Sequence, residues 1–238
     1  YLTLESTPIE LIYNHPPRFT SYEETDAYED TEYNYHITAD DEDGNPVTIS
    51  YNIKPDWLSF TDNGDGTALL TGTPMNTDVG IYTVELSVVD GIVTMKRTQR
   101  YNLLVHNTND PPTDIFLSKQ NIDENEFPGT PVGTLSTEDE DNINGDTHQY
   151  SLVAGAGDED NGRFIITGSS LKTWTTLNYE VKNSYSIRIE TEDSEGVTLE
   201  KPFVITVNDV NDPPSYLHLS NSSIEENQPL NTKVGSFS

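Results

Sequence analysis

The sequence predicts an all-β protein made of tandem seven-stranded Greek-key β-sandwiches arranged end to end. Short runs of alternating polar and apolar residues, bounded by Gly, Asn, Asp and Pro, follow one another through the 238 residues. No segment carries apolar residues at the i, i+3, i+4 spacing of an amphipathic helix. A four-residue motif ending in Pro-Pro recurs roughly every hundred residues, the length of one sandwich domain.

The repeated motif marks the boundaries between domains. It reads Asn-His-Pro-Pro at 14–17 and Asn-Asp-Pro-Pro at 109–112 and 211–214. The second and third copies follow the alternating runs 101–105 and 203–207, and a pair of prolines cannot continue a β-ladder. We therefore expect a last strand of a preceding repeat at 1–13, complete domains at 14–108 and 109–210, and the start of a third, truncated repeat at 211–238.

Within the domain 109–210 the alternation predicts seven strands. They are expected at about 113–119, 132–137, 147–153, 163–167, 170–175, 184–192 and 198–207. Tyr185, Ile187 and Ile189 mark one inward face of this domain, and alternate residues from Tyr82 to Val88 mark the clearest inward row of the domain 14–108. Both domains are therefore expected to have a thin apolar core between two sheets.

Composition excludes several classes of function. The chain has 41 acidic and 12 basic residues, and its formal net charge of −29 would repel nucleic acid and anionic membrane surfaces. The absence of cysteine excludes disulfides and thiolate metal sites. No run of 18 apolar residues offers a membrane span, and no signal peptide is present, which suggests that the chain is part of something longer.

The topology predicts where the acidic residues gather. Seven strands that each reverse direction bring the chain in at one pole of a sandwich and out at the other, and the loops alternate between these poles. The oxygen-bearing residues expected at the entry pole of the domain 109–210 are Asn107, Asn109, Asp110, Asp139, Asp141 and Asp193. Those expected at its exit pole are Glu124, Asn178, Glu180, Asp209, Asn211 and Asp212. Asp41, Asp43 and Asp90 are expected at the entry pole of the domain 14–108.

Such clusters are typical of Ca²⁺ sites. Several carboxylates close together repel one another unless a cation neutralises them, and Ca²⁺ takes six to eight oxygen ligands. The alternative is a solvated acidic surface that serves only solubility.

The domain 109–210 resembles a cadherin repeat of the kind found in large bacterial adhesins. The resemblance rests on an early Glu124, an Asp-x-Asp before a Tyr-Ser-Leu strand, Asn161 to Phe164, Leu-Asn-Tyr-Glu at 177–180, Asp193, and the closing motif 209–214. It implies Ca²⁺ ligation by the residues expected at both poles. Asn178 stands where the family usually has Asp, which removes one charge from the exit-pole site.

The domain 14–108 is similar to the dystroglycan-type cadherin-like module. The matching elements are 39–45, 55–60, Gly-Thr-Pro at 72–74 and 79–82, with Trp57 and Leu58 expected in the core. The module has no counterpart of Leu-Asn-Tyr-Glu, which leaves Glu29, with Asp78 as a second candidate, as its exit-pole ligands. We therefore expect most ions after residue 207, fewer at 107–112, and the fewest or none at 13–17.

The resemblance implies an extracellular or cell-surface location and a calcium-rigidified spacer or adhesion segment whose partners are the neighbouring repeats. Catalysis is not expected, because the sequence has no His-Glu-x-x-His, no Gly-x-Ser-x-Gly and no phosphate loop.

Two other functions are compatible with the sequence. A calcium-dependent carbohydrate-binding or homophilic association module would use exposed aromatic residues, and Trp174, Tyr33 and Tyr35 are the candidates for stacking on sugar rings. A repeat unit of an extracellular filament would donate its incomplete terminal strands.

Overall fold

The computed structural model describes residues 13–91, 95–214 and 216–238. The strand expected at 1–13 lies outside these residues except for Tyr13. The described elements are β-strands and three short 3-10 turns: η1 Asn76–Asp78, η2 Glu140–Asn144 and η3 Asn161–Arg163. None of the described residues belongs to a helix with the length and apolar character needed to cross a membrane. The all-β fold class is therefore confirmed.

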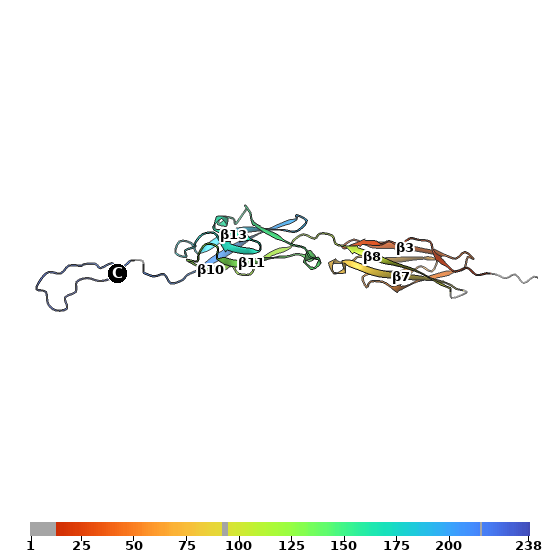
Figure 1. Ribbon diagram of the computed structural model, residues 1–238, viewed down its shortest axis with the longest axis horizontal. Helices are drawn as coiled ribbons and strands as arrows, with labels where there is room; N and C mark the ends of the chain where they lie inside the picture. Colours follow the sequence, from red (N-terminus) through yellow and green to blue (C-terminus); the bar gives the residue numbers. More distant parts are fainter. Residues whose placement is uncertain (1–12, 92–94, 215) are drawn as a thin grey trace, which may run out of the picture. The chain divides into compact units, whose positions relative to one another are not determined.

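The first sandwich consists of two four-stranded sheets. Its strands are β1 Arg18–Phe19, β2 Asp26–Tyr28, β3 Tyr33–Asp40, β4 Val47–Ile53, β5 Ser59–Asp62, β6 Thr67–Gly72, β7 Gly80–Asp90 and β8 Lys96–His106. The sheet orders are β1-β3-β6-β5 and β2-β8-β7-β4, and Figure 1 shows β3 in one layer and β7 and β8 in the other.

The core of the first sandwich follows the predicted alternation. Val84, Leu86 and Val88 are fully buried on β7, while Tyr82 is partly buried and packs against them. Leu58 is buried as expected, and Trp57 packs against the core from its edge. Burial of each such large apolar side chain contributes roughly 1.5–3 kcal/mol, so this row is a substantial favourable contribution to folding.

The expectation that Tyr33 and Tyr35 stack on sugar rings is wrong. Their exposed fractions are 5% and 2%, because odd-numbered residues of β3 face the core. The Tyr33 hydroxyl donates to the Glu24 carbonyl at 2.7 Å, and the Tyr35 hydroxyl donates to Gln99 Oε1 at 2.8 Å. Burial raises the pKa of Tyr33 to about 12. Both residues are hydrogen-bonded core residues.

The second sandwich also has two four-stranded sheets. Its strands are β9 Asp114–Leu117, β10 Asn121–Asp123, β11 Pro131–Glu138, β12 Gln149–Leu152, β13 Phe164–Thr167, β14 Ser170–Thr173, β15 Ser184–Glu192 and β16 Thr198–Asn208. The sheet orders are β10-β16-β15-β12 and β13-β14-β11-β9. Each of the seven expected strands overlaps an observed one, and Tyr185, Ile187 and Ile189 are buried as predicted.

The short strand β10 of the second sandwich was not predicted, and the first sandwich has a counterpart of it, β2. β2 pairs in parallel with β8, and β10 pairs in parallel with β16. Each has three residues, too few to show an alternating pattern. Their position matters for function, because each is followed at once by a glutamate, Glu29 or Glu124, beside the end of the long strand that enters a Pro-Pro linker.

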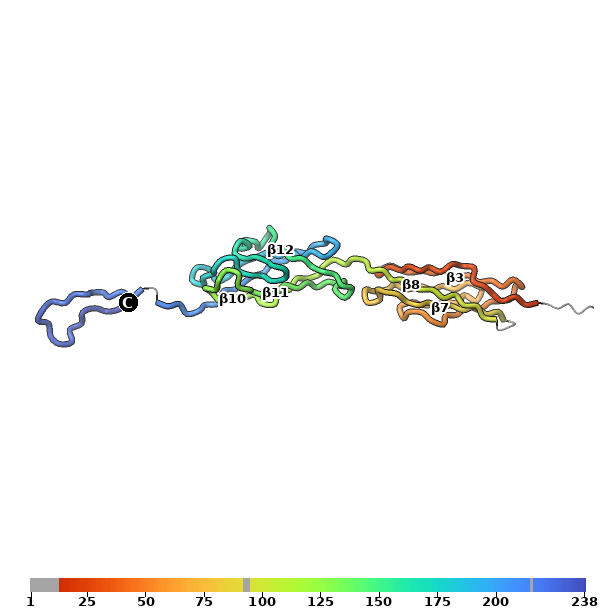
Figure 2. Tube along the Cα trace, viewed as in Figure 1, coloured from red at the N-terminus to blue at the C-terminus, as the bar shows by residue number. Residues whose placement is uncertain are grey.

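Contacts between Cα atoms divide the chain into two compact units. Unit 1 comprises residues 1–116, 136–150 and 190–200, and unit 2 comprises residues 117–135, 151–189 and 201–238. Unit 1 therefore contains the linker 107–112 together with the loops that follow β11 and β15. In unit 2, Figure 2 shows residues 216–238 as a loop that turns back on itself, where Leu219 and Phe237 form an isolated β-bridge.

Candidate metal centre

Glu29, Asp110 and Asp141 bring carboxylate oxygens together within unit 1. One oxygen from each lies within 4.8 Å of the others. Glu29 Oε1 accepts a hydrogen bond from the backbone N–H of Thr108 at 2.5 Å, and Asp141 Oδ2 accepts one from the N–H of Asp110 at 2.6 Å. The parallel ladder fixes Glu29 beside β8, since its own N–H donates to the His106 carbonyl. We call this group the linker cluster.

The linker cluster contains buried negative charge that the protein does not satisfy by hydrogen bonds. Glu29 and Asp141 are each 1% exposed, and neither Glu29 Oε2 nor Asp110 Oδ2 has a hydrogen-bond partner. Burial raises the pKa of Glu29, and the charges of Asp141 and Asp110 raise it further. The pKa of Asp110 is raised by burial and by Asp141. Each unsatisfied buried acceptor costs on the order of 1–3 kcal/mol, so the geometry fits a bound cation.

Asparagine side chains lie beside Asp141 of the linker cluster. Asn107 Nδ2 donates to Asp141 Oδ1 at 2.8 Å, and Asn76 Nδ2 donates to the same oxygen at 3.3 Å. Asn144 Nδ2 donates to the side-chain oxygens of Asn107 and Asn76. Asn76 and Asn144 were not predicted, because both lie in short 3-10 turns without a recognisable motif.

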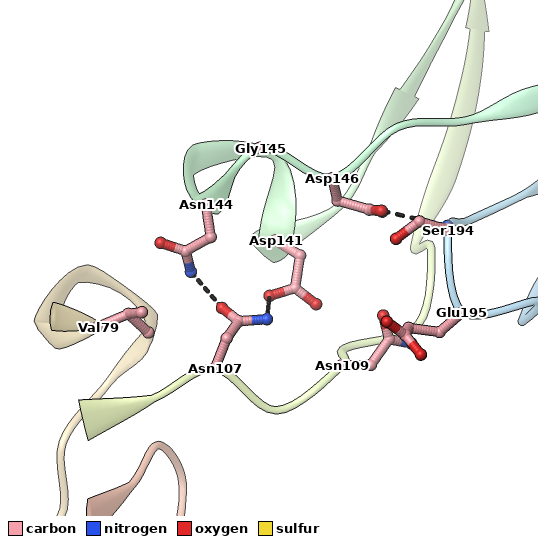
Figure 3. A pocket seen from close by; sticks show the side chains of 9 residues that line it. All are labelled: Val79, Asn107, Asn109, Asp141, Asn144, Gly145, Asp146, Ser194 and Glu195. Carbon is pink, nitrogen blue, oxygen red and sulfur yellow. Dashed lines mark hydrogen bonds between the residues drawn. The ribbon is translucent and has the colours of Figure 1, made fainter. Parts of the chain in front are cut away.

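A cleft of about 510 Å³ opens beside these side chains. Figure 3 shows Asn144, Asn107 and Asp141 joined by hydrogen bonds on one side of it, and Asp146 bonded to Ser194 on another. Its full lining is Val79, Asn107, Asn109, Asp141, Asn144, Gly145, Asp146, Ser194 and Glu195. The cleft is large enough for ions together with the waters that complete their coordination.

Asp139 faces a different group from Asp141, although two positions separate them. Asp139 Oδ1 accepts the N–H of Asp141 at 2.9 Å and caps η2, while its Oδ2 lies 3.1 Å from His148 Nε2. Asp146 Oδ2 lies 3.4 Å from the same nitrogen. Asp146 and His148 were not predicted, because the polarity of a loop residue does not reveal which neighbour it faces. We call these three residues the histidine cluster.

The pKa of Asp146 is lowered despite its burial. Burial alone would raise its pKa, but hydrogen bonds from Ser194 and from the Thr147 N–H, with the nearby His148, lower the pKa overall. The Ser194 N–H donates to Asp146 Oδ1 at 3.1 Å and fixes the orientation of the carboxylate.

Asp193 is held at the start of the turn that follows β15. Its Oδ1 accepts the N–H groups of Glu195 and Val197 at 2.9 and 2.8 Å, and its Oδ2 accepts Asn109 Nδ2 at 2.9 Å. Burial would raise its pKa, but these hydrogen bonds lower it. The structure thus brings the predicted residues Asn109 and Asp193 together.

A further group lies in unit 2 and consists of Glu124, Glu180 and Asp209. Glu124 Oε1 accepts the N–H of Val210 at 2.9 Å, as Glu29 accepts that of Thr108. Its Oε2 accepts the N–H of Tyr179, also at 2.9 Å, and these two hydrogen bonds lower the pKa of Glu124. Glu180 and Asp209 are exposed. We call this group the exit cluster.

Three other residues predicted for the exit pole are turned to other partners. Asn178 Oδ1 accepts the N–H of Val181 at 2.8 Å and closes a turn. Asn211 Nδ2 donates to the carbonyl of Asp212, and Asp212 Oδ1 accepts from Asn125 Nδ2. The side chains of these three residues therefore form hydrogen bonds within their own loops or with a neighbouring loop.

The acids at the entry pole of the first sandwich are held separately. Asp43 pairs with His15 at 3.0 Å, and Asp90 Oδ2 accepts Asn14 Nδ2 at 2.8 Å. Asp41 Oδ1 accepts the N–H of Asp43, while its buried Oδ2 has no hydrogen-bond partner. Among the described residues these three aspartates do not form a compact three-ligand group.

Comparisons with known proteins identify both domains. Residues 16–106 match the family model of a putative Ig domain, and residues 119–208 match that of the cadherin domain. Protocadherin Fat 4 of Homo sapiens is 29% identical over 160 residues, which is 64% of this chain. Protocadherin Fat 2 of Rattus norvegicus is 34% identical over 117 residues, or 47% of this chain. The chain spans 3% of the length of each of these relatives.

Solved structures share the fold. The crystal structure of the Protocadherin GammaB4 extracellular domain has a TM-score of 0.57 at 21% identity, over 94% of this chain and 37% of that one. Human Protocadherin-24 EC1-2 has a TM-score of 0.55 at 19% identity, over 84% of this chain and 100% of that one.

The matches also indicate the class of these two domains. Cadherin domains are non-enzymatic adhesion domains, so the expectation that this chain is not an enzyme is confirmed. The predicted cadherin-like repeats are confirmed as well, and the family that matches the first module is that of a putative Ig domain. The chain therefore contains, in tandem, a region 16–106 that matches a putative Ig domain and a region 119–208 that matches a cadherin domain.

Proposed function

We propose that this chain is a calcium-rigidified segment of a large extracellular adhesion protein, in which Ca²⁺ stiffens the Pro-Pro linkers. The observation that carries this proposal is the linker cluster, with its two buried and unpartnered carboxylate oxygens on Glu29 and Asp110. A hard divalent cation is the partner that such oxygens prefer. Glu29, Asp110 and Asp141 would hold the ion.

Further oxygens in unit 1 would complete the coordination shell. Three carboxylates offer at most six oxygens, and hydrogen bonds to backbone N–H groups already engage some of them. Asn107, Asn109 and Asp193 lie along the same linker and the adjacent turn, and an Asn side chain can rotate its oxygen towards a cation. Ca²⁺ there would tie β2, the linker and η2 to one centre.

The exit cluster would hold Ca²⁺ at the second linker. Glu124 occupies the same place beside Val210 as Glu29 does beside Thr108. Glu180 and Asp209 are exposed, so ligands from the repeat that follows residue 212 would be needed to close this site. The expectation that this linker binds more ions than 107–112 remains a prediction, which metal analysis of the purified chain would check.

Small-angle X-ray scattering tests the proposal. With saturating Ca²⁺ we expect a longer maximum dimension and a narrower distribution of conformations than with a chelator, because the metal would restrict bending at the linker. Mg²⁺ at the same concentration is the control, since its small octahedral shell suits these flexible loops less well. An unchanged maximum dimension after chelation would refute the spacer function.

Self-association of the cadherin domain is a second candidate function. One structural neighbour, at 16% identity, is described as a protocadherin gammaB7 cis-dimer. Trp174 is 61% exposed on this chain and could contribute to such a contact, as it could to the carbohydrate binding considered from sequence. Sedimentation velocity over a range of protein concentrations, with and without Ca²⁺, separates this candidate from a spacer, which stays monomeric.

A further inference from the structure

Acid-free segments adjoin in the sheet β13-β14-β11 of the second sandwich. Residues 127–137, which form all of β11 except its last residue, contain no Asp or Glu, and neither do residues 161–179, which contain β13 and β14. The three strands are neighbours in one sheet. In a chain with 41 acidic residues among 238, this part of the surface is an exception to the general negative charge.

Two cationic side chains without partners lie on the outer side of this sheet. Ile165 of β13 is opposite Lys172 of β14, and both face outwards because the residues next to them along the strands are more deeply buried. Beyond them the Trp174 N–H donates to the Arg163 carbonyl at 2.7 Å, so this pair is opposite as well. Neither Arg163 nor Lys172 forms an ion pair with another described residue.

Cations elsewhere in the chain show why these two are unpaired. The segment 91–109, which contains β8, is also free of acidic residues, but the neighbouring strand β7 supplies Glu85, which pairs with Arg100 at 2.9 Å. Lys182 pairs with Asp160 at 2.6 Å. On β13 and β14 the adjoining strands offer no such carboxylate, so the two charges are left for a ligand.

Exposed aromatic side chains accompany these charges. Trp174 is 61% exposed and Phe127 is 82% exposed. The turn that contains Phe127 rests on β14, since the Gly129 N–H donates to the Thr173 carbonyl at 2.7 Å and Thr173 Oγ1 donates to the Phe127 carbonyl at 3.3 Å. Large apolar side chains left in water next to one another are typical of binding surfaces.

We propose that this surface binds an acidic oligosaccharide. Its residues are Phe127, Arg163, Ile165, Lys172 and Trp174, and we call them the cationic face. The apolar side of a sugar ring stacks on Trp174, while Arg163 and Lys172 bind a carboxylate or sulfate group of the same ligand. The net charge of the chain does not prevent this, because exposed charges more than about 8–10 Å away are largely screened at physiological ionic strength.

The size of the cationic face favours a short glycan over a second copy of this chain. A specific protein partner buries about 800 Å² on each side. The acid-free strands cover roughly 200 Å², because they lie about 4.8 Å apart and β13 and β14 have four residues each. A second copy would extend past Glu126, Asp160 and Glu180, which end the acid-free segments, and would bring its own acidic surface against them.

Isothermal titration of the full chain with two hexasaccharides tests this proposal. Hyaluronan supplies carboxylates and heparin supplies sulfates as well, so the pair distinguishes the two anionic groups. We expect at least one to bind, with an affinity that falls as NaCl is raised. Carboxyl-reduced hyaluronan is the neutral control and should bind at least about 10-fold more weakly than hyaluronan if the carboxylate is the group bound.

Variants locate the binding on the cationic face. Trp174→Ala, Arg163→Gln and Lys172→Gln should each lower the affinity by at least about 10-fold. The matched controls lie in the first sandwich: Tyr22→Ala removes an aromatic ring that is 90% exposed, and Arg97→Gln removes an exposed cation. Both controls should keep the natural affinity. Thermal unfolding checks the folding of each variant, and the two cation variants keep the test valid if Trp174→Ala does not fold.

The proposal is overturned if neither hexasaccharide binds, or if the three folded variants bind as tightly as the natural chain. It is also overturned if sedimentation shows a dimer that Trp174→Ala dissociates and the hexasaccharides do not, because a second copy then occupies the cationic face. The residues of this face belong to unit 2 and include no residue of the linker cluster. Failure of the calcium spacer function would instead appear in the scattering experiment.

Discussion

Replacing Asp141 with asparagine is expected to lower the affinity of the linker cluster for Ca²⁺ by at least about 100-fold. Losing a residue that only orients a metal ligand typically costs 10- to 100-fold, and here a ligand loses its charge. Asp141 is 1% exposed, and hydrogen bonds from Asn107 and from the Asp110 N–H hold its carboxylate in place. Competition with a fluorescent calcium chelator measures this change.

The control for Asp141→Asn is Asp56→Asn, which removes the same charge from an exposed turn. Its effect on affinity should be small, because exposed charges at a distance are screened by salt. Equal affinities of Asp141→Asn and the natural chain would show that Ca²⁺ does not bind at the linker cluster.

Calcium is expected to raise the free energy of unfolding by about 4 kcal/mol when its concentration is 1,000 times its dissociation constant. The effect should be largest near neutral pH, where the carboxylates of the linker cluster are ionised and repel one another. Urea denaturation with Ca²⁺ and with a chelator measures it.

The dependence of the chain's stability on pH should reverse when calcium is removed. The pKa of Glu29 and that of Asp110 are raised in the folded, calcium-free chain, so this state binds more protons than the unfolded chain does. Its stability should therefore fall as the pH rises from the ordinary pKa of a carboxyl group through the raised values. With calcium bound, stability should instead fall on acidification, since protons displace the ion.

The pKa values of Glu124, Asp146 and Asp193 are lowered, so these groups change the stability of the chain at a lower pH than Glu29 and Asp110 do. Their contribution to the free energy of unfolding is present above the ordinary pKa of a carboxyl group and is lost only below it. Glu29→Gln should reduce the rise in stability of the chelated chain on mild acidification, because Gln keeps an acceptor for Thr108 but no charge. A natural chain with the same pH profile in calcium and in chelator would contradict this account.

Much of the fold could be predicted because the sequence pattern is local. The alternation that predicted the face of Tyr185, Ile187 and Ile189 needs only neighbouring residues. The same alternation runs through Tyr33, Tyr35 and Ile37 and would have placed both tyrosines in the core. β10 was not predicted because such a three-residue parallel strand, like β2, depends on a partner about eighty residues away.

The site could be predicted only in outline. The alternation of loops between the two poles of a sandwich indicated that Glu29, Asp110 and Asp141 would share a region, and the structure places their oxygens together. This alternation could not show that Asp139 and Asp141 face different groups, since their directions depend on the turn of η2. Nor could it show that Asn178 turns to the Val181 N–H, because short polar side chains bond to the nearest backbone group.

The short strand β2 also protects β8, which would otherwise be an open sheet edge at this point. The N–H of Leu104 donates to the Thr25 carbonyl, and the N–H of Glu29 donates to the His106 carbonyl. Few hydrogen bonds therefore hold β2 on β8. A metal ion on Glu29 would anchor its end. We expect chelation to speed hydrogen exchange at the Leu104 amide, and unchanged exchange would contradict this. Calcium would then guard the chain against strand addition by other chains, which is how exposed edges begin to aggregate.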